Sequence, residues 1–272
     1  MREIMAEDVV DRPRRWELLR AGFSNWHVPA LLAFINYRSN RVWPGRLTAV
    51  GDLRCDLRAR SGTRLVARVR DVNAPAEVFG RNEYDRAGID WPGVEYVLDL
   101  GGHVGSFTLW AAARTRARFF TVEPNPAVFE LLRRNVARAG LDDRVELRQA
   151  AIGDAPGRSW LELDADSASS RLRGREPTDG GLEVEVITLE QAMAEAAFPR
   201  VDVVKMDIEG AEYGALAGAR SALLGSVRHW VIECHPGRDG SAASVARRLA
   251  DAGLRSSVSP KPDQLALVTA SR

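Results

Sequence analysis

The sequence predicts an α/β protein built on a mostly parallel sheet, and two observations favour this fold class. From residue 93 onward, apolar runs of strand length alternate with segments whose apolar residues recur at helical spacing. Several of these apolar runs also end in an acidic or polar residue. Alternating strands and helices form a parallel sheet covered on both faces, and such sheets bind ligands at the carboxyl ends of their strands.

The composition of the chain is that of an ordinary globular protein. Its 272 residues are 45% hydrophobic and 28% charged, and 38 basic residues against 37 acidic ones leave a net charge of +1. This balance gives no field that would attract nucleic acid or an anionic membrane. The two cysteines show no C-x-x-C pairing, which argues against a disulfide framework or a zinc site. Residues 1–20 are charged throughout, and no early apolar run is long enough to span a bilayer, so we expect a cytoplasmic protein.

The first 92 residues predict an appendage to the main domain. Residues 1–45 carry apolar residues at helical spacing, punctuated by prolines, and predict helices. Residues 47–72 change to a period of two around a Ser-Gly-Thr turn, which is typical of a β-ribbon. Residues 74–86 predict a short helix that leads into the main domain. We therefore separate residues 1–92, which would supply a lid, substrate contacts or dimer contacts, from a ligand-binding domain at residues 93–272.

The main domain follows the alternation in order. The apolar residues of 94–98 form a strand, a glycine-rich turn follows, and residues 106–113 begin a helix. The apolar run 118–122 is the next strand, and 127–139 is a helix that stops at Gly140. The later elements rest on the same two patterns: strands at 145–152, 201–206 and 230–234, a hairpin from 160–163 and 184–189, helices at 190–197, 213–224 and 242–252, and two closing strands at 255–258 and 265–269.

The glycine-rich turn after the first strand predicts a small-molecule site. Its glycines let a ligand approach the backbone, and the free N–H groups of the following helix face that ligand. A nicotinamide-binding fold would need a glycine at Leu100, and the Asp99 carboxylate would lie close to the pyrophosphate. That carboxylate suits the cationic amino-acid end of a ligand such as S-adenosylmethionine. A plain strand–helix connection is the alternative reading of the turn alone.

The ends of the next two strands supply further cofactor contacts. Glu123 lies where an acidic residue accepts hydrogen bonds from a ribose diol, and Ala151 offers a flat apolar surface to adenine. His103, inside the turn, is interpreted as a loop residue that touches the cofactor. Together with the turn and the helix start, the predicted cofactor-binding residues are Asp99, Gly101, Gly102, His103, Gly105, Phe107, Thr108, Glu123, Pro124, Asn125, Ala151 and Asp207.

The densest charged cluster at any strand end is the block KMDIEGAE at residues 205–212. Lys205 and Asp207 point to one face of the strand, and Glu209 and Glu212 share a face of the following helix start. The block reads either as a capped helix with an ion pair or as groups that orient or deprotonate a substrate. His235, after the fifth strand, is a candidate general base, and a structural role for it stays open.

With these residues in view, the sequence resembles the FkbM family of S-adenosylmethionine-dependent methyltransferases. The stretch VLDLGGHVGSFTL at 97–109 resembles the first motif of that family, and VEPNP at 122–126 the second. The hallmark is VDVVKMDIEGAEYGAL at 201–216, which matches the K-x-D-x-E-G-x-E block, and AEVFGRNEY and VITLEQ match flanking segments. The resemblance runs from about residue 65 to 235 and departs at Gly102-His103, where the family usually has Ala-Asn.

The resemblance implies a Rossmann-like class I methyltransferase core with a seven-stranded, mostly parallel sheet, preceded here by the helical segment and the β-ribbon. It implies S-adenosylmethionine as cofactor and methyl transfer to a hydroxyl of a natural product or sugar. N-methylation of a small molecule or peptide, and a non-catalytic cofactor-binding scaffold, are the alternatives. The expected partner is a small-molecule acceptor, with no nucleic acid and no membrane span, and a homodimer stays open.

Residue roles follow from the same resemblance. We assign catalysis to Asp207, Glu209 and His235. The predicted substrate-contacting residues are Glu77, Tyr84, Lys205 and Glu212. No metal site is assigned, although some sugar O-methyltransferases bind magnesium through strand-end aspartates, which leaves magnesium at Asp207 open.

Overall fold

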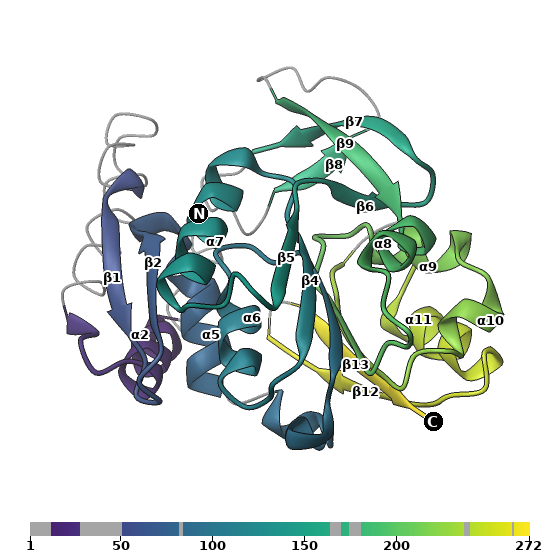
Figure 1. Ribbon diagram of the computed structural model, residues 1–272, viewed down its shortest axis with the longest axis horizontal. Helices are drawn as coiled ribbons and strands as arrows, with labels where there is room; N and C mark the ends of the chain where they lie inside the picture. Colours follow the sequence, from purple (N-terminus) through teal and green to yellow (C-terminus); the bar gives the residue numbers. More distant parts are fainter. Residues whose placement is uncertain are drawn as a thin grey trace, which may run out of the picture.

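The computed structural model is built around a seven-stranded sheet with the strand order β12-β13-β11-β10-β3-β4-β5. The structure describes residues 12–27, 51–81, 84–163, 170–173, 181–236, 240–262 and 264–272. All neighbouring strands are parallel except β13, which is antiparallel to both of its neighbours. The predicted mostly parallel α/β fold is confirmed (Figure 1). The strands are β3 (Tyr96–Leu100), β4 (Arg118–Val122), β5 (Val145–Arg148), β10 (Val203–Met206), β11 (His229–Cys234), β12 (Arg255–Pro260) and β13 (Ala266–Ser271).

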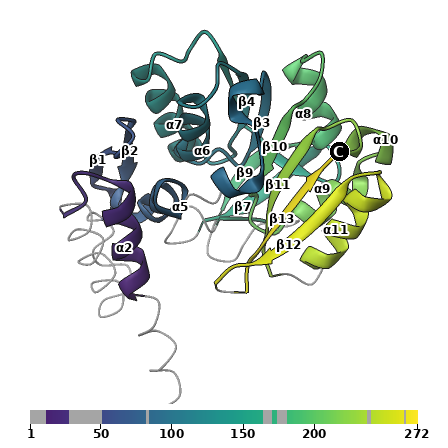
Figure 2. The ribbon, with the colours of Figure 1, turned by 90° about the horizontal axis from the view of Figure 1, so that it is seen from below.

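Helices cover both faces of this sheet (Figure 2). Successive side chains of a strand point to opposite faces, so each strand contributes to two cores. Val97 packs into the core under α6 and α7, and Leu98 packs into the core under α8, α9 and α11. None of the helices within the described ranges is long and apolar enough to cross a bilayer. The helices on the first face are α6 (Ser106–Ala112) and α7 (Pro126–Arg138), and those on the second are α8 (Leu189–Ala196), α9 (Glu212–Gly218), α10 (Ser221–Leu224) and α11 (Ala242–Asp251).

The N-terminal elements pack against α6 and α7. They are α2 (Arg12–Gly22), the antiparallel ribbon of β1 (Arg54–Arg58) and β2 (Arg64–Arg68), and α5 (Asn73–Arg81). Phe23 and Leu65 of these elements share one hydrophobic cluster with Phe107 and Trp110 of α6. The predicted ribbon is therefore present and is joined to the main domain by a common core. The helical region predicted at 28–45 lies outside the described residues.

Two of the predicted elements are divided in the structure. The strand expected at 145–152 separates into β5 and β6 (Ala151–Gly153), and β6 joins a second, four-stranded sheet with β9 (Leu182–Thr188), β7 (Gly157–Glu162) and β8 (Arg171–Arg173). The predicted hairpin corresponds to the antiparallel pair of β7 and β9. The helix expected at 213–224 is split into α9 and α10 because the backbone of Ala219 is extended. Just before this break, Gly218 lies close to the backbone of Asp154.

A single buried amide connects the ribbon, α7 and the glycine-rich turn. The Asn135 side chain on α7 is fully buried, and its Oδ1 accepts the backbone N–H of Val66 at 2.7 Å. Its Nδ2 donates to the carbonyl oxygens of Val66 and Val104, both at 2.8 Å. Val104 lies inside the glycine-rich turn. The Asn135 amide thus forms the pair of hydrogen bonds with Val66 of β2 that a neighbouring strand would form. Its bond to Val104 also holds the glycine-rich turn.

We expect Asn135→Ala to lower the free energy of unfolding by roughly 3 kcal/mol, because it leaves three buried backbone groups without partners. Asn25 is the matched control, since its exposed amide donates to the carbonyl of Asp56 at 2.7 Å and accepts the N–H of Arg58 at 2.9 Å. Water replaces those bonds in Asn25→Ala, so its loss should stay below about 1 kcal/mol. Equal losses in urea titrations of the two variants would contradict the role given to Asn135.

Candidate functional site

The glycine-rich turn lies at the carboxyl end of β3, held between the ends of β4 and β10. The N–H groups of Gly101 and Gly102 both donate to the carbonyl of Val122, at 3.0 and 2.9 Å. Gly101 has φ +83°, and a Cβ there would collide with the carbonyl oxygen of Asp207. Glycine is required at this position both by the left-handed conformation and by the close backbone approach.

A buried ion pair supports the turn. Asp99 and Lys205 are direct register partners on β3 and β10, and their charged atoms lie 3.2 Å apart. The Nζ of Lys205 also donates to the carbonyl of Gly101 at 2.6 Å, and the hydroxyl of Thr108 donates to Asp99 at 2.6 Å. Burial alone would lower the pKa of Lys205, but the charges of Asp99 and Asp207 outweigh it and raise that pKa. Burial raises the pKa of Asp99, and Lys205 and Thr108 counter this in part.

Glu123 forms part of the wall above the turn. One of its carboxylate oxygens accepts the backbone N–H of His103 and the other accepts that of Asn125, both at 2.9 Å. Burial raises the pKa of Glu123, and His103 and the two backbone donors offset this in part. Because a carboxylate oxygen has two lone pairs, each still has capacity for a further donor from a ligand.

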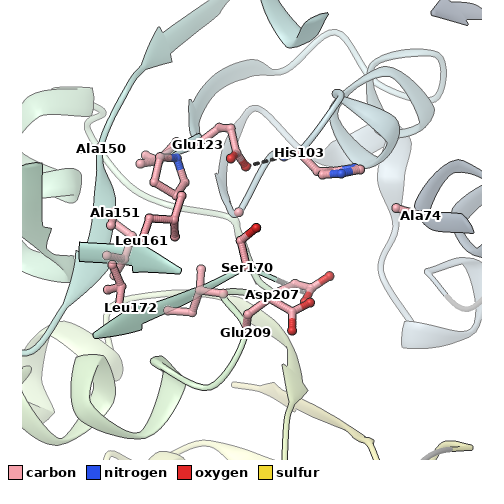
Figure 3. Close-up of a pocket in the computed structure, with 15 residues that line it drawn as sticks. Ala74, His103, Glu123, Ala150, Ala151, Leu161, Ser170, Leu172, Asp207 and Glu209 are labelled. Atoms are coloured by element: carbon pink, nitrogen blue, oxygen red, sulfur yellow. Dashed lines mark hydrogen bonds between the residues drawn. The ribbon is translucent and has the colours of Figure 1, made fainter. Parts of the chain in front are cut away.

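A pocket opens between this wall and the end of β10 (Figure 3). One side is apolar and comes from strands of the four-stranded sheet, with Ala151 and Ile152 of β6, Leu161 of β7 and Leu172 of β8. The polar groups lie around the rest of the pocket: the His103 ring points away from the apolar side towards Ala74, and the carboxylates of Asp207 and Glu209 lie beside each other. The remaining lining residues are Ala74, Gly101, Val122, Glu123, Pro124, Ala150, Ser170 and Ile208.

Two of the three pocket carboxylates, Asp207 and Glu209, are carried on a tight turn after β10. Glu209 has φ +56°, which is uncommon for a residue with a side chain, and Gly210 follows at φ +101°. One oxygen of Glu212 accepts the N–H groups of Ile208 and Gly210, at 3.1 and 3.2 Å, and so closes the turn. The side chains of Asp207 and Glu209 keep 32% and 20% of their surface exposed, whereas Glu212 is fully buried.

His235, just after β11, is surrounded by carboxylates. Its Nδ1 lies 3.0 Å from Glu212, and its Nε2 lies 3.3 Å from Glu209 and 3.7 Å from Asp207. Burial alone would lower the pKa of His235, but the hydrogen bonds to Glu209 and Glu212 and the charge of Asp207 raise it to about 11. The imidazole is therefore protonated at neutral pH. This does not suit the general base predicted at His235, because a base must start without the proton.

The surroundings shift the pKa values of the pocket carboxylates Asp207 and Glu209 in opposite directions. Burial alone would raise the pKa of Asp207, but Lys205 and His235 outweigh it and hold that pKa below its ordinary value. Burial raises the pKa of Glu209, and His235 offsets this only in part. Paired titratable groups whose environments separate their pKa values are typical of acid–base sites.

Comparison with known proteins agrees with this geometry. Residues 99–255, more than half of the chain, match the family model described as the methyltransferase FkbM domain. The chain belongs to the FkbM methyltransferase family. The predicted Rossmann-like class I methyltransferase core is confirmed. One pocket of this FkbM domain is lined by residues of the glycine-rich turn, by Glu123 and by the 205–212 block.

Three curated proteins are similar to this chain. The chain is 29% identical over 213 residues to the AMB antimetabolite synthetase AmbE of Pseudomonas aeruginosa, covering 64% of this chain and only 10% of that protein. It is 31% identical to the 2-O-methyltransferase NoeI of Sinorhizobium fredii, over 47% of this chain and 58% of that protein. It is 27% identical to the 31-O-demethyl-FK506 methyltransferase FkbM of Streptomyces tacrolimicus, over 65% of this chain and 79% of that protein.

Several residues predicted for the FkbM site lie outside its pocket. Asp99, Lys205 and Thr108 are enclosed beneath the turn. The rings of Phe107 and Tyr84 pack against each other at a tilted angle, with centroids 4.7 Å apart, within the aromatic cluster around Trp110. The turn and the start of α7 are shaped by Gly102, Gly105 and Asn125, which do not line the pocket. Glu212 is fully buried beside His235, and Glu77 pairs with Arg81 at 3.4 Å.

Sequence reasoning missed several lining residues of the FkbM pocket, among them Leu161, Leu172, Ser170 and Ala74. Leu161 and Leu172 belong to the hairpin sheet, whose period-two pattern shows which side chains share a face without showing that this face meets the pocket. Ser170 precedes β8, a three-residue strand with no sequence signal. Ala74 comes from α5, so the N-terminal elements contribute to the pocket wall.

The strand ends of this FkbM domain also offer a group of metal-ligating types. Asp207, Glu233 and His235 provide ligand atoms within 4.8 Å of one another. Two of them already hold partners, because Lys261 forms an ion pair with Glu233 and the protonated His235 is held by carboxylates. Magnesium also prefers an all-oxygen set. The residues therefore do not fit a magnesium ion, and no step of the chemistry is derived through one.

The charge on His235 predicts a pH dependence of stability. Because its pKa is raised in the folded protein, its stabilising contribution is full below its ordinary pKa of 6.5 and is lost as the pH rises towards about 11. Above neutrality we expect this group to contribute a decline of up to about 1.4 kcal/mol per pH unit in the free energy of unfolding. Denaturant titrations across this range should show a flatter decline in His235→Gln. The exposed His27→Gln variant should behave as the wild type, and an unchanged slope in His235→Gln would reject the assignment.

Proposed function

We propose that this chain is an S-adenosylmethionine-dependent methyltransferase that acts on a hydroxyl group of a small molecule, such as a natural product or a sugar. The observation that carries the proposal is the pair of carboxylates, Asp207 and Glu209, which line the same pocket as Glu123 and the glycine-rich turn. The names of NoeI and FkbM, which refer to O-methylation, favour oxygen as the acceptor atom.

The pocket residues fit the cofactor in three places. Glu123 has lone pairs left for the hydroxyls of a ribose, since each of its oxygens accepts only one backbone N–H. The apolar side formed by Ala151, Leu161 and Leu172 suits a flat aromatic base. The backbone around Gly101 is open to the amino-acid end. When bound, S-adenosylmethionine supplies a methyl group on a sulfonium centre, which a nucleophile attacks in line.

The acceptor hydroxyl must lose its proton as its oxygen gains the methyl group. Glu209 is suited to take this proton because its raised pKa makes it a stronger base than an ordinary carboxylate. Asp207 has a lowered pKa and stays ionised, which suits a group that orients the acceptor by accepting a hydrogen bond. We therefore assign the base to Glu209 and the orienting role to Asp207, while the His235 imidazolium holds both carboxylates.

Nitrogen is the second candidate acceptor. Asp207 and Glu209 would also attract a protonated amine, and the same base would deprotonate it before attack. A screen of hydroxylated and aminated small molecules for the mass gain of one methyl group distinguishes the two. Residues 1–92 are proposed to form part of the acceptor wall in either case, because Ala74 of α5 lines the pocket.

Calorimetry tests the cofactor site directly. We expect S-adenosylmethionine to bind the wild-type protein, and Glu123→Ala to weaken binding by at least about tenfold through the loss of about 1.4 kcal/mol or more of charge-assisted hydrogen bonding. Glu146→Ala is a suitable control, because Glu146 is an exposed glutamate on the neighbouring strand β5. Absence of binding to the wild type would end the cofactor assignment.

Turnover of the acceptor found in the screen tests the base. Glu209→Gln should lower kcat by roughly 10²- to 10⁴-fold, the usual contribution of a positioned base, and leave the affinity for S-adenosylmethionine within about threefold. Glu195→Gln removes an exposed carboxylate that pairs with Arg148 and should leave kcat unchanged. If Glu209→Gln turns over at the wild-type rate, Glu209 is not the base.

A further inference from the structure

Glu212 is the most completely enclosed carboxylate of the 205–212 block, and it does not line the pocket. It is the first residue of α9, and its side chain has no exposed surface. A carboxylate in such a place is costly unless its partners compensate for the lost hydration. Its contacts therefore indicate what the residue does for the site.

One oxygen of Glu212 joins three separate pieces of the site. Oε1 accepts the N–H groups of Ile208 and Gly210, and the Nδ1 of His235 lies 3.0 Å away. The first two contacts close the left-handed turn that presents Glu209 at φ +56°. Such a backbone conformation costs about 1–3 kcal/mol and persists only where the surroundings enforce it. The hydrogen bonds that the Glu212 carboxylate accepts hold the turn in this conformation.

The third contact fixes the histidine. Because Nδ1 faces Glu212, Nε2 faces the pocket carboxylates, Glu209 at 3.3 Å and Asp207 at 3.7 Å. The hydroxyl of Tyr213 donates to the backbone carbonyl of His235 at 2.7 Å and holds the chain at the same point. Among the described residues, other titratable groups near this cluster include Lys205, which lies 3.9 Å from Asp207, His103, and Lys261, which pairs with Glu233.

We propose that Glu212 is a positioning residue for methyl transfer: its single buried carboxylate holds both the turn that carries Glu209 and the His235 ring, whose Nε2 faces Glu209 and Asp207. Without that ring, two carboxylates at one pocket edge would repel each other and turn apart. The effect on turnover rests on the proposed function. The effect on His235 does not, and it is measurable without any substrate.

The decisive variant is Glu212→Gln, which keeps an oxygen for the two backbone donors and removes the charge. In the wild type the raised pKa of His235 keeps its ring protonated to about pH 11. Loss of a carboxylate at hydrogen-bond distance should move the titration midpoint of His235 down by about 1–3 pH units. Nuclear magnetic resonance of the ring signals reports this, and His235→Gln identifies the signal among the four histidines.

Glu190→Gln is the matched control. Glu190 also lies in the first turn of a helix and accepts a backbone N–H, that of Arg220 at 3.3 Å. Unlike Glu212, it is not among the partners of His235 and pairs with Arg220 instead. It should leave the His235 midpoint unchanged. An unmoved midpoint in Glu212→Gln would overturn the proposal, whatever the protein is found to methylate.

Turnover then tests the positioning role. In Glu212→Gln we expect kcat to fall at least tenfold, with KM for S-adenosylmethionine within about threefold, because the cofactor wall at Glu123 is untouched. Glu212→Asp keeps the charge and should restore part of the loss. If Glu212→Gln fails to fold, the midpoint and kcat are read from Glu212→Asp, which should show smaller shifts in the same directions. Wild-type values in the folded variant would overturn the proposal. A moved midpoint with no methyl transfer in any variant, including the wild type, would instead refute the proposed function alone.

Discussion

The buried pair of Asp99 and Lys205 is the interaction on which the rest of the site depends. The two residues are neighbours in register on the central strands, and Lys205 reaches from this pair to the carbonyl of Gly101. Removal of either partner would leave an uncompensated charge in the core, which is strongly destabilising. The same lysine lowers the pKa of Asp207 at the pocket. The turn, the sheet centre and the pocket charge are thus tied to one ammonium group.

The charges at the carboxyl edge of the sheet follow a simple order. Lys205 neutralises Asp99, Lys261 neutralises Glu233, and the His235 imidazolium neutralises Glu212. Asp207 and Glu209 share Lys205 and His235 with these partners and keep exposed surface in the pocket. The excess of carboxylates over cations therefore lies at the pocket, where the proposed function would bring a cationic sulfonium ligand and an acceptor proton.

The sequence was sufficient for the sheet and for the turn, because strand runs and glycine spacing are local signals. It was insufficient for contacts between residues that are distant in the chain. The pairing of Asp99 with Lys205 depends on the register of β3 and β10, which the sequence does not show. Lys205 was therefore predicted to contact substrate. Tyr84 matched a family motif, yet it is buried against Phe107. His235 was predicted as a base because its ordinary pKa is near neutrality, and the sequence does not show the three carboxylates that raise this pKa in the fold.

The Asn135 amide has a consequence for how the N-terminal ribbon can vary. All three of its bonds go to main-chain atoms, two on Val66 and one on Val104. The ribbon is therefore docked by its backbone, whatever side chains it presents outward. The side chains that share the core with α6, such as Leu65, must stay apolar for the ribbon to dock. The outward positions of β1, at Arg54, Asp56 and Arg58, are free of both constraints and can change without loss of this docking.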